Sequence, residues 1–167
     1  MRVTIDVDSS KARSKLRTLK DSQKTGMYKA IGKSVVSNIQ QMFFLQKSPW
    51  NQAWKPVLRT TGGPILRLSG QLFSSIQSNA YTNKAIISTN KRYASTHQFG
   101  ETIVPKKGKY LIFKLNGATI FALKVTIPAR PFMPLKSKNQ ALWPPRWKEK
   151  AMSAGKNYIL KRMKSVK

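Results

Sequence analysis

The most regular pattern in this chain occupies residues 25–46 and reads TGMYKAIGKSVVSNIQQMFFLQ. Its apolar residues recur every three to four positions, which places them on one face of a helix. The face is formed by Met27, Ile31, Val35, Ile39 and Met42. We therefore predict a long helix over residues 25–46. Gly26 either breaks this helix from a preceding one or lies in a bent continuous helix, because both are compatible with the pattern.

The residues before this helix predict two further elements. Val3, Ile5 and Val7 alternate with polar residues, which is typical of a strand with one buried face, so residues 2–7 are predicted to form a strand. A helix is predicted to follow, capped by Ser9 or Ser10. Its apolar stripe is Ala12, Leu16 and Leu19.

After residue 46 the helical pattern stops, and residues 47–64 contain prolines, glycines and two tryptophans. This composition predicts an irregular loop with aromatic anchors. The following segments predict a short helix over residues 69–77, a strand over 85–88 and one or two helical turns over 93–99. Gly100 stands where a glycine ends a helix.

Two apolar runs flank Asn116-Gly117, which is the strongest short-range signal for a β-hairpin. We predict its strands at 110–115 and 118–126. Residues 127–134 contain three prolines and are predicted to be extended, because each proline also keeps its predecessor out of the helical region. A helix is predicted at 146–164, and its many lysines leave its docking open.

Together these elements predict an α+β fold, in which an N-terminal strand and long helices pack on a small antiparallel sheet with a hairpin near 110–126. We predict one domain at residues 1–135. A basic C-terminal extension, helical in character, follows at residues 136–167.

The charge of the chain is extreme, with 32 Lys and Arg against 5 Asp and Glu and a formal net charge of +27. Self-repulsion of this size favours an anionic partner or a crowded assembly. The chain has no cysteine and one histidine, so thiol chemistry is excluded and few groups remain for acid–base catalysis. Asp6 and Asp8 share a strand face, but a catalytic metal site needs more carboxylates. We expect no enzyme activity, no metal and no cofactor.

The N-terminus alternates and carries acids, unlike a signal peptide. The longest strongly apolar run, Met42–Leu45, is far shorter than the roughly 20 residues of a membrane-spanning helix. We expect neither export by a signal peptide nor a membrane partner.

Four ordered blocks resemble the phage virion morphogenesis family, which includes tail-completion proteins of Mu-like and related contractile-tailed phages. The resemblance covers about residues 25–135, although the loop between Trp54 and Leu66 is short for the family and the basic tail lies outside the shared blocks. The blocks are Ser48-Pro49-Trp50 with Trp54-Lys55-Pro56, Leu66–Leu72 with Ser75-Ile76, Tyr93-Ala94 with His97–Gly100, and Ile127–Phe132.

The resemblance implies a structural virion protein, made in the host cytoplasm, that joins the end of the tail tube to the head connector as a ring. Implied partners are further copies of itself and tail tube, tail terminator or head connector proteins. The cations would face acidic connector proteins or DNA in the neck channel, without reading sequence. The alternative is a non-specific nucleic-acid-binding protein, although the lysines and arginines are scattered rather than gathered in one recognition element.

Interface residues are expected in loops and stiff extended segments, because helices mainly carry packing. The candidates are Trp50, Trp54, His97, Gln98, Phe99, Gly100, Pro128, Arg130, Pro131 and Phe132. Any of these residues could instead serve only the fold of its own chain. The tryptophans would pin the loop to the core, and His97 would bond to backbone at the Gly100 turn. Arg130 would contact either a neighbouring subunit or its own chain.

Overall fold

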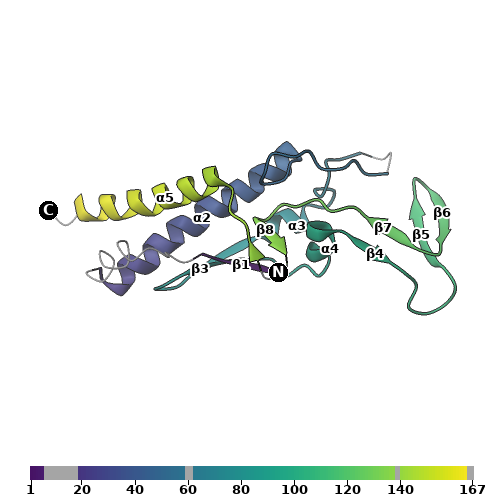
Figure 1. Ribbon diagram of the computed structural model, residues 1–167, viewed down its shortest axis with the longest axis horizontal. Helices are drawn as coiled ribbons and strands as arrows, with labels where there is room; N and C mark the ends of the chain where they lie inside the picture. The colour runs from purple at the N-terminus through teal and green to yellow at the C-terminus, as the bar shows by residue number, and fades with distance from the viewer. Residues whose placement is uncertain (6–18, 59–61, 138–139, 165–167) are drawn as a thin grey trace.

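The computed structural model describes residues 1–5, 19–58, 62–137 and 140–164. The molecule is elongated, with two long helices toward one end and a two-stranded hairpin at the other (Figure 1). Small antiparallel sheets accompany the helices, so the predicted α+β class is confirmed. Residues 6–7 of the predicted N-terminal strand and the predicted helix that begins at Ser9 or Ser10 lie outside the described residues.

Helix α2 (Asp21–Leu45) contributes more residues to the core than any other element. It begins four residues before the predicted start and continues through Gly26, so the alternative of a break at this glycine is wrong. A Cβ at Gly26 would collide with the ring of Tyr158 in the C-terminal helix, so this glycine leaves room for the packing of the two helices. The Lys20 backbone N–H donates to Gln23 Oε1 at 2.9 Å, which satisfies one donor at the start of the helix.

A three-stranded antiparallel sheet packs against α2 in the order β1-β3-β2. The strands are β1 (Arg2–Ile5), β2 (Gln77–Ala80) and β3 (Ala85–Ser88). Strand β2 was not predicted, and the helix predicted at 69–77 is shorter, forming α3 (Gln71–Ser74). The segment Gln77-Ser78-Asn79-Ala80 has little strand propensity. It is extended because it pairs along β3 and because Ser78 lies against Gly32 of α2.

The second half of the chain contains helix α4 and two strand pairs, β4 with β7 and β5 with β6. These elements are α4 (Ala94–Phe99), β4 (Glu101–Ile103), β5 (Leu111–Leu115), β6 (Ala118–Ala122) and β7 (Val125–Ile127). The helical turn closed by Gly100 and the hairpin around Asn116-Gly117 are confirmed. The single strand predicted at 118–126 is wrong, because its last residues leave β5 and pair with β4.

The C-terminal residues form a short strand pair and a long helix that packs along α2 (Figure 1). They are β8 (Leu135–Ser137), β9 (Gln140–Ala141) and α5 (Pro145–Lys164). Trp147, Ala151 and Gly155 form the buried stripe of α5. A Cβ at Gly155 would lie 3.0 Å from Ile31 Cδ1, so the missing side chain permits the close approach of the two helices. Helix α5, whose docking the sequence left open, therefore packs on α2. The predicted domain boundary after residue 135 stays a prediction.

The centre of the core is aromatic. Phe43 of α2 lies with its ring centroid 5.5 Å from Trp54, 5.8 Å from Phe73 and 5.3 Å from Phe132. These side chains come from the helix, the irregular loop, α3 and the proline-rich segment. One ring of α2 therefore joins this helix to three other segments.

Candidate functional site

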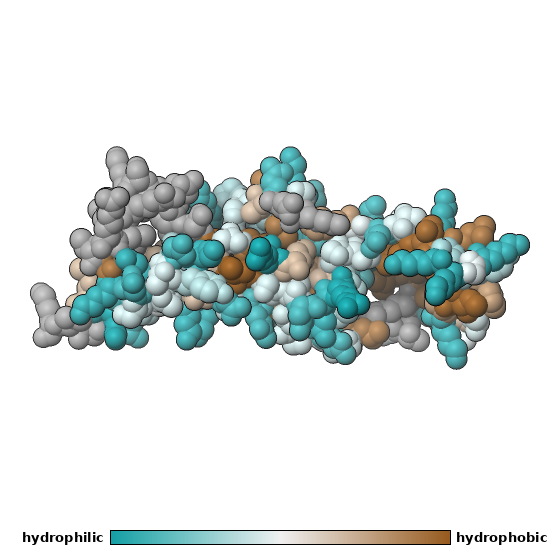
Figure 2. All heavy atoms as spheres, turned by 90° about the horizontal axis from the view of Figure 1, so that it is seen from below, coloured by the Kyte–Doolittle hydropathy of each residue, from teal (hydrophilic) through white to brown (hydrophobic). Residues whose placement is uncertain are grey.

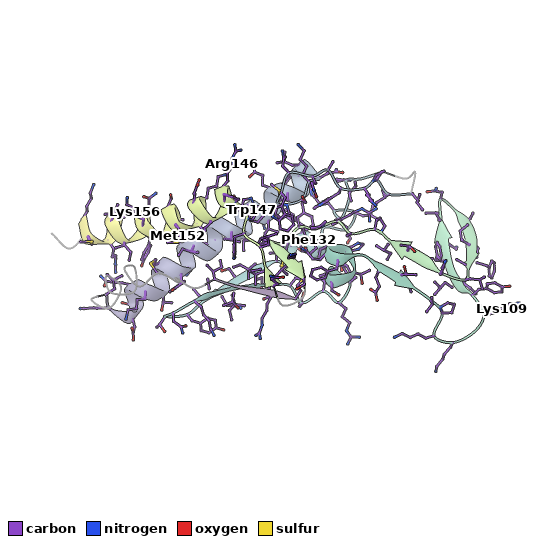
Figure 3. All side chains as sticks on the ribbon, in the orientation of Figure 1. Lys109, Phe132, Arg146, Trp147, Met152 and Lys156 are labelled. Atoms are coloured by element: carbon purple, nitrogen blue, oxygen red, sulfur yellow. The ribbon has the colours of Figure 1, made fainter. Side chains whose placement is uncertain are left out.

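The proline-rich segment 128–134, which we call the strap, crosses the core rather than its surface. Phe132 and Met133 are fully buried, and Phe132 lies in the interior of the molecule (Figure 3). Gln98 of α4 holds this segment with both ends of its amide. Its Oε1 accepts the backbone N–H groups of Phe132 and Met133, each at 3.0 Å. Its Nε2 donates to the carbonyls of Met133 at 2.9 Å and Leu135 at 3.3 Å.

Two side chains connect the strap to the irregular loop. The Trp54 indole N–H donates to the carbonyl of Pro131 at 2.7 Å. Buried Arg130 donates from Nε to the Lys55 carbonyl and from Nη2 to the Pro56 carbonyl, each at 2.8 Å. The loop-pinning interpretation of Trp54 and the internal contact foreseen for Arg130 are both seen in the structure.

His97 contributes to the same site mainly through its backbone. Its carbonyl accepts the Arg130 N–H at 2.6 Å, and its ring lies edge-on to Tyr93 with centroids 5.9 Å apart. Its Nδ1 is buried and has no hydrogen-bond partner among the described residues, so the predicted side-chain bond at the turn is not formed there. Gly100 adopts φ 75°, which residues other than glycine rarely adopt. A Cβ there would also lie only 2.9 Å from the backbone nitrogen of Ala129, so the close approach of the strap requires glycine at this position.

The structure thus brings most of the predicted interface residues together around the strap, with many of them inside the protein. Trp54, Gln98, Arg130 and Phe132 are buried; Trp50, His97, Phe99, Gly100, Pro128 and Pro131 are partly buried. Their visible role is to hold one chain together. A direct contact of any of them with a neighbouring subunit stays a prediction.

The state of His97 predicts a dependence of stability on pH. Burial, and secondly the nearby Arg130 guanidinium, lower the pKa of His97 below 6.5. The unfolded chain therefore binds more protons than the folded one as the pH falls below about 6.5, and stability is lost on acidification while being fully present above that pH. We expect a lower melting temperature at pH 5.0 than at pH 7.5 by calorimetry.

His97 is the single histidine of the chain, so the origin of this effect can be isolated. In His97→Gln the difference in melting temperature between the two pH values should shrink. An undiminished difference in that variant would show that another group is responsible.

Several strongly exposed apolar residues lie on a projecting β-ribbon, residues 104–124, which we call the arm. It contains β5 and β6, with Ile112 opposite Phe121 and Phe113 opposite Ile120, so both of its faces carry apolar side chains. Ile112 is 65% exposed and Phe121 is 61% exposed. Figure 2 shows brown side chains gathered at this end of the molecule with teal side chains around them. We call Tyr110, Ile112, Phe121 and Leu123 the apolar face of the arm.

Lysines surround this apolar face. The arm contains Lys106, Lys107, Lys109, Lys114 and Lys124 and no acidic residue. The Lys109 ammonium lies 5.5 Å from the centroid of the Tyr110 ring, and that ring meets Phe121 edge-on at 6.3 Å. Lys109 lies at the opposite end of the molecule from α5 (Figure 3).

Sequence reasoning found the hairpin but missed the exposure of the arm. The available signal was the lack of a polar face. Residues 110–115 and 118–123 do not alternate cleanly between apolar and polar, as a ribbon packed on one side would.

Other kinds of site find no support in the described part of the chain. Across residues 1–5, 19–58, 62–137 and 140–164, no group of three or more His, Asp or Glu side chains is placed to hold a metal ion. Within the same ranges no helix is long and apolar enough to cross a membrane. A hollow beside β1 is lined by Arg2, Ser88, Thr89 and Leu135, among others, and brings together no acid–base pair.

These features define a small, basic α+β protein whose most prominent surface is a projecting apolar ribbon ringed by lysines. Residues 8–142 match the model of the phage virion morphogenesis family. The chain belongs to this family, which confirms the resemblance of the four sequence blocks. The family is a structural and morphogenetic one that is generally non-enzymatic.

One similar protein is "Mu-like prophage FluMu G protein 2" from Haemophilus influenzae. It is 32% identical over 115 residues, which are 69% of this chain and 69% of that protein. No solved structure matches the chain. The chain is therefore a phage virion morphogenesis protein that is distantly related to the G protein of a Mu-like prophage.

Proposed function

We propose that this chain is a non-enzymatic subunit of a ring that completes the phage tail at the junction with the head. Membership of the virion morphogenesis family supports a role in building the particle. The observation that carries the proposal is the exposed apolar face of the arm. A projecting apolar surface of this kind commonly marks a site of contact with another component, which suits a subunit that assembles into a particle.

The charge bears on how such a ring forms. Subunits with a formal net charge of +27 repel one another, so a ring of them needs anions on a neighbouring component. Tail tube, tail terminator and head connector proteins are the partners that we propose, together with further copies of this chain. DNA passing through the ring would supply additional phosphate charge, without base-specific contacts.

The test is native mass spectrometry or mass photometry of the purified chain, alone and with purified tail tubes, before and after nuclease treatment. We expect a discrete multimer on tube ends that survives nuclease, and electron microscopy should place it at the head-proximal end. A monomer that gains mass only with nucleic acid would contradict the proposal. That result would favour the second function, non-specific nucleic-acid binding, for which the high charge is the supporting observation.

A further inference from the structure

We infer that the arm docks on an acidic protein of the phage particle, and not on another copy of this chain. Its apolar face would enter a groove rimmed by carboxylates, and one edge of its ribbon would add to a strand of the partner. This inference rests on the proposed function and names the chemistry of the partner that the arm selects.

The first argument is that the arm is incompletely covered. A two-stranded ribbon is marginally stable in water by itself and usually needs a third strand or a covering element. Within the described residues β5 pairs only with β6, and the apolar face points to solvent. One tie to the rest of the chain is a long hydrogen bond of 3.5 Å from Asn116 Nδ2 to the carbonyl of Leu58. A partner that covers the ribbon would supply the missing apolar contacts.

The second argument concerns the backbone. Outer N–H and C=O groups of β5 and β6 face away from the ribbon, and in the described part of the chain no further strand joins them. Such an edge is a template for strand addition, in which main-chain bonds give affinity and alternating side chains give specificity. A protein strand satisfies these groups. The hydrocarbon of a membrane cannot, which disfavours insertion of the arm into lipid.

The third argument is charge complementarity. The five lysines of the arm require anions at the rim of the docking site, since burying them beside like charges would cost affinity. The whole chain has only five acids. Of those described, Asp21 pairs with Lys24 at 3.1 Å and Glu101 accepts from Thr96 at 2.6 Å. Glu149 lies between Lys148 and Lys150 on α5. The described part of a second copy therefore offers no group of acids that could form such a rim.

DNA is the remaining anionic candidate, and the side chains of the arm argue against it. A two-stranded ribbon fits the major groove, but there it uses polar side chains to reach base edges and phosphates. On the face that carries Ile112 and Phe121, the neighbouring cross-strand pair Lys114 and Thr119 is polar, whereas the flanking residues Tyr110 and Leu123 are large and mainly apolar. This composition resembles the core and rim of a protein interface.

The experiment uses the full chain with two arm variants and one control. The double variant Ile112→Ser/Phe121→Ser removes the apolar face, and Lys114→Glu/Lys124→Glu reverses its rim. The control Met152→Ser/Leu160→Ser changes two exposed apolar residues of α5. Binding is measured by co-sedimentation with tails purified from phage that lack this protein. A 60-base-pair duplex and vesicles of phosphatidylcholine with phosphatidylglycerol serve as the other probes.

We expect each arm variant to bind tails at least tenfold more weakly than the wild type. The control should bind tails like the wild type, and the apolar variant should bind DNA and vesicles like the wild type. Unchanged melting temperatures would show that the core is intact. Carbodiimide coupling should join arm lysines to Asp or Glu of a different protein, which peptide mass spectrometry then identifies.

Wild-type affinity of both arm variants for tails would overturn the inference while leaving the proposed function in place. Coupling of arm lysines only to Glu149 of further copies would also overturn it. So would a loss of DNA or vesicle binding in the apolar variant without a loss of tail binding. Failure of the wild-type chain to bind tails at all would overturn both proposals.

Discussion

Replacing Gln98 by leucine is expected to lower the free energy of unfolding by about 2–6 kcal/mol. The change leaves the buried backbone N–H groups of Phe132 and Met133 without their acceptor, and each orphaned group costs about 1–3 kcal/mol. The measurement is urea denaturation followed by tryptophan fluorescence. Gln41→Leu, an exposed change of the same kind in α2, should alter stability by less than about 0.5 kcal/mol. Equal losses of stability in the two variants would contradict the view that the hydrogen bonds of Gln98 hold the strap in place.

Replacing Gln98 by glutamate tests the accepting and the donating hydrogen bonds of its amide separately. In Gln98→Glu one oxygen still accepts the two N–H groups, but the other meets the carbonyls of Met133 and Leu135. Burial and these carbonyls should raise the pKa of the introduced carboxyl above the usual value of about 4.3. The folded variant then binds more protons than the unfolded chain. Its stability should be greatest below about pH 4.3, relative to the wild type, and fall as the pH rises. A penalty that does not vary with pH would contradict this geometry.

Replacing Phe43 by alanine is expected to cost about 3–5 kcal/mol, the usual range for removing a buried phenylalanine. Phe43 is fully buried and touches the rings of Trp54, Phe73 and Phe132, so the cavity would open where the helix, the loop and the strap meet. Thermal and urea denaturation both measure this loss. A loss of this size is a large fraction of the stability of a typical domain, so the melting temperature of the variant should fall well below that of the wild type.

The adjacent residue provides a matched control. Phe44 is 59% exposed and lies under the Arg67 guanidinium, 4.0 Å from the ring centroid. Its replacement by alanine removes the same atoms but little buried area, and should cost about 1 kcal/mol or less. If Phe44→Ala destabilised the protein as much as Phe43→Ala, the packing of the buried rings around Phe43 would not explain the loss of stability.

Local patterns predicted the elements whose signals are short in range. The apolar stripe of α2 marked both its existence and its buried face, and Asn116-Gly117 marked the hairpin with positive φ at both turn residues. Gly100 marked the end of α4. In each case the deciding interactions join residues that are a few positions apart, so the element can be predicted from the local sequence pattern.

Elements that depend on distant partners were missed or misplaced. Strand β2 exists because β3 and α2 flank it, and β7 separates from β6 because β4 offers another partner. The packing role of Gly26, which leaves room for Tyr158 of α5, cannot be seen from either segment alone.

The candidate site shows the same division. The sequence nominated the Pro-Ala-Arg-Pro-Phe segment, the residues His97 to Gly100 and the tryptophan loop as separate interface candidates. Only the structure shows that the three lie together, joined through Gln98, Trp54 and Arg130. Whether such residues face a partner or the interior depends on which segments fold over them. For Gln98 and Phe132 the answer is the interior.

Sequence by itself determined the class of fold, the family, the extreme positive charge and the small number of groups able to catalyse. These follow from composition, periodicity and short ordered motifs, which every residue carries locally. Tertiary structure alone decided that the strap is buried, that α5 lies on α2 and that the arm stands apart with its apolar face in solvent. Burial is a property of the surroundings of a residue, and those surroundings come from segments that are far away in the chain.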